Sequence, residues 1–427
     1  MVSARRMVYL LLALSLLAGA LTGAQLYYRL SYLWVLLLAG SWLMAKTALR
    51  GIQVNRRARF LRSQVGQVFE ERYEVRNPGR IPRLWIEVRD DSSLPGTSGS
   101  HVVTMIGSKE SRTYVARTRL EERGVFPLGP TVIASGDLFG LFPTERSIPN
   151  SEALLVYPML VPVHDFPNPP GLLPGGEALR RRTAQITSNA AGVREYEPGD
   201  PLHRIHWLST ARRNRLMAKE FELDPLADVW LFVDADRSVH LSKPLPEEEF
   251  VMTAVWQKRT QFDLPPSTIE YGVSIASSLA RYYLQRGRAV GTVYSNSQLK
   301  VLPSDRGGRQ LNKILESLAV VQAVGEMPLE GLVEVQARHL PRGSTAVIIT
   351  PSTSESVFRT TDVLLRRGLR PVVVLLDGST FGGEDNPDEL AASLEFLGVP
   401  VCRVAFNDDL SKVLSNAVSQ PNLVKAW

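Results

Sequence analysis

The stretch VWLFVDADRS, residues 229–238, begins with five apolar residues and continues into a polar part that contains two aspartates and a serine. Two similar runs follow it, TAVIIT at 345–350 and PVVVLLD at 371–377, with amphipathic stretches between them. Unbroken apolar runs rich in β-branched residues predict strands covered on both faces, the environment of a parallel sheet between helices. The sequence therefore predicts a doubly wound α/β sheet within residues 226–427.

The rest of this region supplies the other elements of such a sheet. Further strands are expected at 289–295, 298–302 and 400–406, and helices at 267–287, 308–321, between 350 and 368, at 388–397 and at the C-terminal end. The long stretch 237–266 between the first strand and its helix is expected to be either a binding surface or a disordered loop.

Polar residues follow the first strand at the place where such sheets bind ligands. Ligands of doubly wound sheets lie beside the carboxyl ends of strands, which points to Asp234, Asp236 and Ser238. Their oxygens are of the kind that Mg²⁺ prefers, so the sequence predicts an incomplete site for Mg²⁺ or Mn²⁺. The alternative is that Asp234 ends the strand and accepts hydrogen bonds from backbone amides of the following loop.

The N-terminal end holds two apolar runs without acidic residues. MVYLLLALSLLAGALTGA begins at Met7, and LSYLWVLLLAGSWLMA begins at Leu30. A helix needs about 20 residues to cross a bilayer core, so a hairpin of two transmembrane helices is predicted within residues 1–50, over about 7–26 and 30–49. A cleaved signal peptide is the alternative for the first run, but the second run close behind it favours the hairpin.

Basic residues set the expected orientation of this hairpin. Residues 1–62 contain nine basic residues and no acidic residue, while the rest of the chain has 40 basic and 43 acidic ones. The net charge of +6 therefore comes from the anchor and does not predict nucleic-acid binding. The flanking basic residues are Arg5 and Arg6 before the first run, Arg29 between the runs, and Lys46, Arg50, Arg56, Arg57 and Arg59 after the second. Because basic residues stay on the inner side, we expect an integral protein of the inner membrane with its soluble part in the cytoplasm.

Residues 51–165 read as a β-rich module. Alternating apolar and polar residues, interrupted by Gly, Pro and Asn, predict a small antiparallel sandwich or barrel, with strands at 69–77, 84–90, 101–107 and 111–120 and a continuation over 123–142. Phe139, Leu141 and Phe142 are expected in its core. The Pro- and Gly-rich residues 166–190 predict a linker, and the arginines at 180–182 are expected on a solvated face.

Residues 191–225 form the next segment, which begins AGVREYEPGDPLHRIHWLSTARRNRLMAKEFE. Pro198 and Gly199 predict a turn, and Asp200 suits the N-cap of a helix with Pro201 in its first position. Trp207 is expected to be partly buried. A strand is expected from 216 to 223.

This segment resembles the signature of domain-of-unknown-function family 58. The matching residues are Gly192, Arg194, Tyr196, Gly199, Asp200, Arg204, Trp207, Ala211 and Arg212. The resemblance covers most of the chain and implies two N-terminal spans, a β-rich region and a von Willebrand A-like domain. It also implies a link to MoxR-type AAA+ ATPases, often beside transglutaminase-like membrane proteins, and no general activity.

The resemblance also bears on the cation site. Von Willebrand A-like domains hold a divalent cation with a DxSxS motif, which Asp234 and Ser238 match, whereas Asp236 replaces the first serine. Pro351 stands where related domains commonly have Asp, and no Thr lies near Gly307. Ligands of a complete site are therefore missing.

No catalytic constellation is found in the sequence. His203 and His206 lack the third ligand and the acid of a helix-borne zinc site. Cys402 lies in an expected strand, where a buried, inert thiol is favoured over a nucleophile, and there is no GxGxxG, Walker or GxSxG motif.

Two functions are therefore considered. The first is a membrane-anchored cytoplasmic interaction or scaffold protein that partners a MoxR-type AAA+ ATPase in the assembly or maturation of complexes. The alternative is a metal-dependent, hydrolase-like enzyme that uses Asp234 and Asp236 together with Asp200, Arg204 and His206. No nucleic-acid partner and no small-molecule substrate is predicted.

Overall fold

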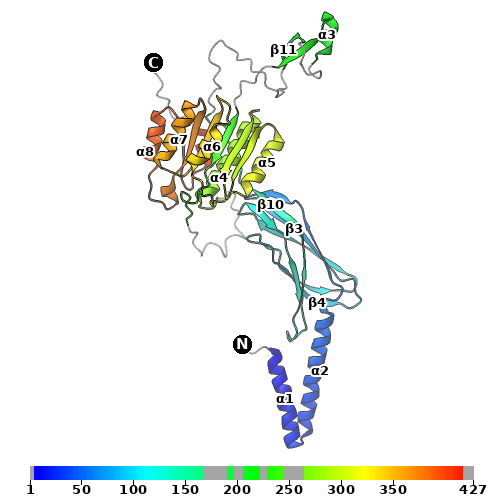
Figure 1. Cartoon of the computed structure of the whole chain (residues 1–427). Helices are drawn as coiled ribbons and strands as arrows, with labels where there is room; N and C mark the ends of the chain where they lie inside the picture. The colour runs from blue at the N-terminus through cyan, green and yellow to red at the C-terminus, as the bar shows by residue number, and fades with distance from the viewer. Residues whose placement is uncertain (1–3, 168–189, 197–204, 222–227, 244–263, 417–427) are drawn as a thin grey trace. The chain divides into compact units, whose positions relative to one another are not determined.

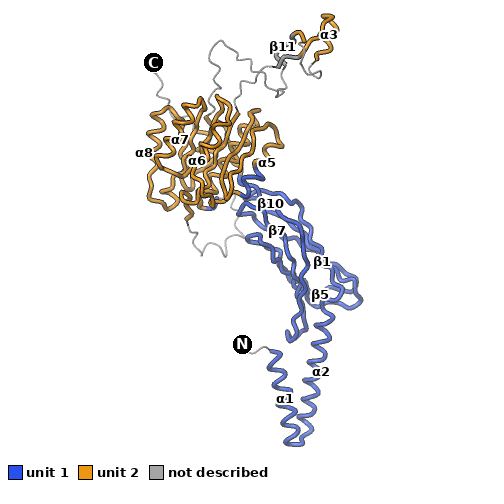
Figure 2. Tube along the Cα trace, viewed as in Figure 1, with its two compact units in different colours: residues 1–159, 256–265, 315–320 blue, residues 160–255, 266–314, 321–427 orange. Residues whose placement is uncertain are grey.

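The computed structural model describes residues 4–167, 190–196, 205–221, 228–243 and 264–416 (Figure 1). Its contacts divide the chain into two compact units (Figure 2). The first consists of residues 1–159, 256–265 and 315–320, and the second of residues 160–255, 266–314 and 321–427.

Two apolar helices begin the first unit, α1 (Ala4–Thr22) and α2 (Gln25–Ala48). Both are long and apolar enough to cross a membrane, a test of length and composition that a signal sequence near the N-terminus also passes. The hydroxyls of Ser15 and Ser31 lie 3.0 Å apart where the two helices meet. Most of the leucines are exposed, among them Leu14 and Leu36. The expected pair of apolar helices is thus present.

Ten short strands follow in the same unit. They are β1 (Gln53–Ala58), β2 (Arg62–Gln64), β3 (Val68–Arg76), β4 (Arg83–Asp90), β5 (His101–Ile106), β6 (Ser111–Arg119), β7 (Gly124–Pro127), β8 (Thr131–Ser135), β9 (Thr144–Ile148) and β10 (Ala153–Tyr157). They form three sheets in the orders β1-β3-β6, β5-β4-β8-β9 and β2-β10-β7, and every pairing is antiparallel except that of β10 with β2. The expected β-rich region is confirmed.

The alternating sequence of these strands produces the core between the first two sheets. In β3 every second residue is buried, and Tyr73 and Val75 pack against Ile86 and Val88 of β4. Side chains on one strand point alternately to opposite faces, so this alternation leaves one face of each sheet for solvent.

Helix α2 is firmly joined to this β-rich region. Leu49, which directly follows the helix, belongs to the same buried cluster as Val75. The hydroxyl of Thr144 donates a hydrogen bond to the carbonyl oxygen of Ala45 at 3.2 Å, and the guanidinium of Arg83 donates one to the carbonyl oxygen of Arg50 at 3.1 Å. The end of α2 and the first sheets therefore form one packed structure.

A buried charge cluster that the sequence reasoning missed lies in this region. The Arg56 side chain, 5% exposed, forms paired hydrogen bonds with Glu71 (2.7 and 2.9 Å) and with Asp90 (2.8 and 3.0 Å). Burial raises the pKa of Glu71; for Asp90, hydrogen bonds from Thr97 and Arg56 outweigh burial and lower the pKa. Arg56 was counted among the basic residues that flank the second apolar run. Its charge is instead compensated inside the fold.

One prediction for the core was wrong. Leu141 is buried, but Phe139 is 62% exposed and its neighbour Leu138 is 65% exposed. Both side chains project from the loop between β8 and β9. The apolar pattern alone could not distinguish a loop that displays its apolar residues from one that buries them.

The second unit contains a six-stranded sheet. Its strands are β13 (Val229–Val233), β14 (Val290–Ser295), β15 (Leu299–Asp305), β16 (Thr345–Thr350), β17 (Arg370–Leu376) and β18 (Val401–Val404), in the order β15-β14-β13-β16-β17-β18. All neighbours are parallel except β14 and β15. The expected mostly parallel α/β sheet is confirmed.

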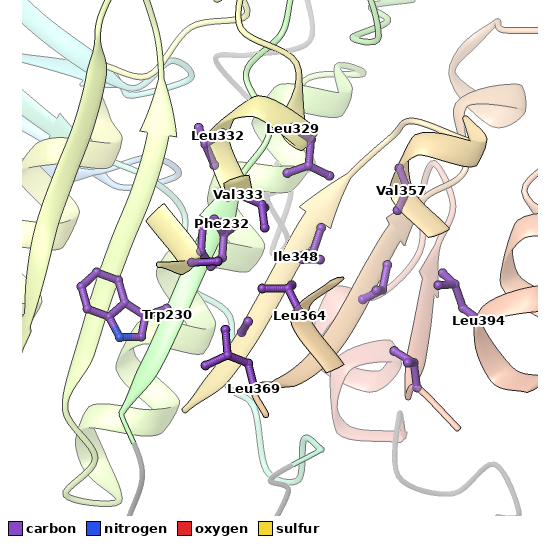
Figure 3. Close-up of a cluster of buried hydrophobic side chains, with 14 of the residues drawn as sticks. Trp230, Phe232, Leu329, Leu332, Val333, Ile348, Val357, Leu364, Leu369 and Leu394 are labelled. Atoms are coloured by element: carbon purple, nitrogen blue, oxygen red, sulfur yellow. The ribbon is translucent and has the colours of Figure 1, made fainter. Parts of the chain in front are cut away.

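Helices lie on both faces of this sheet. They are α4 (Thr268–Gln285), α5 (Gly308–Ala319), α6 (Leu329–Ala337), α7 (Glu355–Arg366), α8 (Asp388–Phe396) and α9 (Leu410–Asn416), with a short 3₁₀ helix η3 (Gly378–Phe381). Phe232 and Ile348 belong to one cluster with Leu332 of α6 and Leu364 of α7 (Figure 3). On the other face, a Cβ at Gly272 of α4 would lie 3.6 Å from Ile349. Neighbouring residues of one strand thus pack against different helix layers.

One helix, α6, is not expected from the sequence. The sequence predicts no element between the helix 308–321 and the strand that begins at Thr345. In the structure Leu329, Leu332, Val333 and Ala337 are buried along one side of α6. These spacings of three and four residues form the apolar stripe of a helix.

An extended segment before the sheet is held by side chains of α4. The backbone N–H of Val161 donates to the hydroxyl of Ser278 at 2.9 Å, and that of Phe166 donates to the hydroxyl of Tyr282 at 3.1 Å. Phe166 is fully buried. The second unit accordingly begins at Leu160.

Candidate functional site

The candidate site lies at the carboxyl end of β13, the central strand that ends at Val233. Asp234 follows directly and is buried. Its backbone N–H donates to the carbonyl oxygen of Ile349 at 3.0 Å, continuing the pairing of β13 with β16. One carboxylate oxygen accepts a hydrogen bond from the backbone N–H of Asp236 at 3.1 Å. This is the arrangement expected for a residue that ends the strand and fixes the loop behind it.

The second carboxylate oxygen of Asp234 is bonded by a residue that the sequence analysis did not single out. The hydroxyl of Thr350, the last residue of β16, donates to it at 2.7 Å. Thr350 is fully buried, and its own oxygen accepts a hydrogen bond from the backbone N–H of Ser352 at 3.0 Å. Burial raises the pKa of Asp234, and the hydrogen bond from Thr350 opposes this effect. Only the adjacency of β13 and β16 brings these residues together.

Asp236 and Ser238 form a tight turn after the strand. One oxygen of Asp236 accepts hydrogen bonds from the backbone N–H of Ser238 at 2.9 Å and from its hydroxyl at 2.8 Å. Ser238 is exposed and Asp236 is half-buried. The hydroxyl proton of Ser238 is therefore directed at Asp236. The two hydrogen bonds between these residues stabilise the turn without a bound ion or ligand.

Gly325 brings a second loop against this turn. Its N–H donates to the carbonyl oxygen of Ala235 at 2.9 Å, and the N–H of Arg237 donates to the carbonyl oxygen of Gly325 at 3.0 Å. A Cβ at this position would lie 2.3 Å from the carbonyl oxygen of Ser295 and 2.8 Å from that of Ala235. Only glycine permits backbones to approach so closely.

His240 fastens the far end of the turn. One ring nitrogen lies 2.9 Å from the carbonyl oxygen of Asp234, and the other lies 2.9 Å from the hydroxyl of Thr268 at the start of α4. Thr268 in turn accepts a hydrogen bond from the backbone N–H of Leu241 at 2.9 Å. The loop after β13 is thus linked to the sheet and to α4. Residues 244–263 of the long stretch before α4 lie outside the described part.

The residues of this site fit a divalent cation poorly. Mg²⁺ requires about six oxygen ligands in octahedral arrangement. Here both oxygens of Asp234 already accept internal hydrogen bonds, and the hydroxyls of Thr350 and Ser238 donate to carboxylates. Among the described residues no group of three His, Cys, Asp or Glu side chains could hold a metal ion. The cation site at Asp234, Asp236 and Ser238 stays a prediction.

The signature segment contains β11 (Ala190–Glu195), α3 (Trp207–Arg213) and β12 (Met217–Phe221). β11 and β12 pair in antiparallel fashion, with Gly192 opposite Glu220 and Arg194 opposite Ala218. The N–H of Tyr196 extends the pairing by donating to the carbonyl oxygen of Leu216 at 2.9 Å. Gly199, Asp200 and Arg204 lie outside the described residues, as do His203 and the arginines at 180–182.

Two expectations for this segment were wrong. The helix begins at Trp207 with His206 as its N-cap, whose ring nitrogen accepts a hydrogen bond from the N–H of Ser209 at 3.3 Å. Ile205, which a helix beginning at Pro201 would include, instead forms an antiparallel bridge with Ala218. Trp207, expected to be partly buried, is 67% exposed, and its neighbour Leu208 is 61% exposed. Ala211 and Arg212 are exposed on the same short helix.

Cys402 is buried in β18, and burial raises the pKa of its thiol to about 12. A thiol with this pKa forms almost no thiolate near neutral pH and is a poor nucleophile. This environment agrees with the inert role expected from its place in a strand.

A family model matches a part of the chain that includes most of the signature segment. Residues 192–257 match the family model described as "Protein of unknown function DUF58". Over 260 residues the chain is 21% identical to "Uncharacterized protein YeaD" of Bacillus subtilis (strain 168), which covers 60% of this chain. The chain spans 57% of the length of that relative. The chain is thus a distant homologue of an uncharacterised protein, with a family match confined to these residues.

Solved structures add no information on function. The CARDB domain of the PF1109 protein from Pyrococcus furiosus, in complex with di-metal ions, matches with 15% identity and a TM-score of 0.18, over 25% of this chain and 91% of that one. The GH20 exo β-N-acetylglucosaminidase of Vibrio harveyi matches with 7% identity and a TM-score of 0.17, over 81% of this chain and 59% of that one. TM-scores this low carry no structural argument.

Proposed function

We propose that the chain is a membrane-anchored interaction protein whose soluble part docks a cytoplasmic partner. Helices α1 and α2 serve as the anchor, because their apolar side chains, such as Leu14 and Leu36, are exposed and would otherwise face water. The basic residues at the two ends of the hairpin, Arg5 at the start of α1 and Lys46 at the end of α2 among them, keep both ends in the cytoplasm. Removing the compensated Arg56 from the count leaves this asymmetry intact, since Arg29, in the second turn of α2, is the only basic residue near the connection between the helices.

The observation that carries the docking role is the exposure of Trp207 and Leu208 side by side on α3. A large aromatic side chain that is two-thirds exposed is unusual, and exposed tryptophans are frequent energetic centres of protein interfaces. These residues lie within the segment that matches the family model. The partner that the resemblance implies is a MoxR-type AAA+ ATPase, which would dock on α3 and on the doubly wound, von Willebrand A-like domain that follows it.

The enzyme alternative has weaker support. It requires Asp234 and Asp236 to bind a metal ion, yet both oxygens of Asp234 already accept hydrogen bonds from the protein. Titration of the full chain with Mg²⁺ or Mn²⁺ in a calorimeter tests this alternative. We expect no heat of binding. A stoichiometric heat that disappears in Asp234→Asn would favour the enzyme.

Co-purification tests the docking role. The full chain, solubilised from native membranes, should retain an AAA+ ATPase that the Trp207→Ala/Leu208→Ala double variant loses. Phe396→Ala is the matched control, because Phe396 on α8 is also an exposed aromatic residue, at 94%. An ATPase retained by the double variant, or none bound to the unmodified chain, would contradict the proposal.

A further inference from the structure

The loop between β8 and β9, residues 136–143, displays apolar side chains on a rigid frame. Asp137 is buried, and its carboxylate accepts hydrogen bonds from the backbone N–H groups of Phe142 at 2.7 Å and Phe139 at 3.0 Å. These bonds outweigh the effect of burial and hold the pKa of Asp137 below its usual range. Leu138 and Phe139 are thereby held outward, with about two-thirds of each side chain exposed. A fixed display of two large apolar side chains indicates a binding surface.

This loop lies beside the end of α2. Phe142, its last apolar residue, lines an open apolar groove of about 380 Å³ together with Leu38 and Trp42 of α2 and Tyr9 of α1. The next residue but one, Thr144, donates a hydrogen bond to the carbonyl oxygen of Ala45. The loop is therefore fixed at the end of the helix hairpin that carries Arg5, Arg6 and Lys46.

A second exposed apolar group lies at the same end. Ile81 and Leu84, at the turn before and the start of β4, are both exposed. With Met44 and Thr47 of α2 they line a smaller groove of about 240 Å³. Two separate connections of the β-rich region thus present apolar side chains around the last turns of α2.

Positive charge and aromatic rings surround this end. The guanidinium of Arg5 lies 5.8 Å from the ring centroid of Phe142, and the amine of Lys46 lies 4.7 Å from that of Trp42. Aromatic rings and basic side chains that reach towards phosphates are typical of the headgroup region of a bilayer. The carboxylate of Asp137, in contrast, is buried and bonded to the backbone.

We propose that the loop 136–143, with Ile81 and Leu84, inserts into the headgroup and acyl boundary of the bilayer that α2 crosses. The occupant of this apolar surface is lipid, because the surface continues the apolar surface of α2 and is bordered by Arg5 and Lys46, which suit anionic headgroups. The insertion seats the β-rich region directly on the membrane. This inference rests on the proposed membrane anchoring.

Depth-dependent fluorescence quenching tests the insertion. The full chain is reconstituted in vesicles of phosphatidylcholine and phosphatidylglycerol, and single cysteines at Leu138→Cys, Leu36→Cys or Val125→Cys carry an environment-sensitive fluorophore. Val125 is the matched control, an apolar residue on β7 that is 53% exposed. Leu36 of α2 reports on the anchor. The native Cys402 is buried and stays unlabelled.

We expect lipids with a quencher at the top of the acyl chain to remove most of the fluorescence at residue 138 and little at residue 125. If lipids with a quencher deep in the acyl chain quench the label at residue 36, near the middle of α2, but the shallow quencher does not quench the label at residue 138, the loop does not insert while the anchor stands. If neither label is quenched, the anchoring itself fails. Protection of residue 138 from aqueous iodide without quenching by lipid would identify a protein partner or a second copy as the occupant, and would also overturn the proposal.

Discussion

The hydroxyl of Thr350 lies 2.7 Å from a carboxylate oxygen of Asp234, although 116 residues separate the two in the chain. Both side chains are buried, at the ends of the neighbouring parallel strands β16 and β13. The hydrogen bond thus joins the two strands at the place where a cation was predicted. Together with the backbone N–H of Asp236, Thr350 thus gives each carboxylate oxygen of Asp234 a hydrogen-bond donor from the protein itself.

Replacing Thr350 by valine should destabilise the sheet by about 1–3 kcal/mol, because a buried carboxylate oxygen loses its donor. Urea denaturation of the purified full chain, followed by tryptophan fluorescence, measures this change. Thr350→Ser retains the hydroxyl and should be distinctly more stable than Thr350→Val. Equal stability of the two variants would show that the hydrogen bond contributes little.

The buried cluster of Arg56 predicts a larger effect. Replacing Arg56 by methionine leaves Glu71 and Asp90 buried without their cation, which should cost about 3–5 kcal/mol. Arg57, the next residue, is exposed, so Arg57→Met should change the free energy of unfolding by no more than about 0.5 kcal/mol. A stability of Arg56→Met close to that of Arg57→Met would contradict the assigned role.

Two glycines predict opposite effects of the same substitution. Gly325→Ala places a methyl group against the carbonyl oxygens of Ser295 and Ala235, so the loop must move, at a cost of about 1–3 kcal/mol or more. Gly331 lies within α6, where the nearest atom to an added methyl is in the side chain of Met327, at 3.5 Å. Gly331→Ala should therefore be neutral or stabilise the protein by about 0.5–1 kcal/mol. Thermal unfolding of both variants measures these changes in stability. A Gly325→Ala variant as stable as the unmodified chain would contradict the close approach of Gly325 to the carbonyl oxygens of Ser295 and Ala235.

The thiol of Cys402 should not react in the folded protein. Its pKa of about 12 and its buried position leave almost no accessible thiolate at pH 8. An aromatic disulfide reagent should release its chromophore only after a denaturant is added. Rapid reaction at pH 8 without denaturant would mean that β18 opens readily.

The order of elements was readable because each strand and most helices have their own local signal. TAVIIT at Thr345–Thr350 is entirely apolar or β-branched, and the strand matches the expected bounds. Helix α6 was missed because it lies in a long stretch between a helix and a strand. Its apolar stripe was weaker than the signals around it.

The site was less predictable, since its contacts depend on which strands become neighbours. Nothing local to Thr350 indicates that its hydroxyl would face Asp234; only the pairing of β16 with β13 does. The same holds for Arg56, which reads as one more basic residue after an apolar run until β1 and β3 bring it to Glu71. Phe139 shows the reverse case, an apolar residue that a hydrogen-bonded turn keeps on the surface.

Cysteine labelling in cells tests the membrane topology most directly. Ala24 lies between α1 and α2, and Phe396 is a highly exposed residue of α8. With the cytoplasmic membrane intact, an impermeant maleimide added from outside should label Ala24→Cys and leave Phe396→Cys unlabelled until the membrane is opened. Labelling of Phe396→Cys in intact cells, or a soluble protein that begins near residue 25, would contradict a cytoplasmic protein held by two spans.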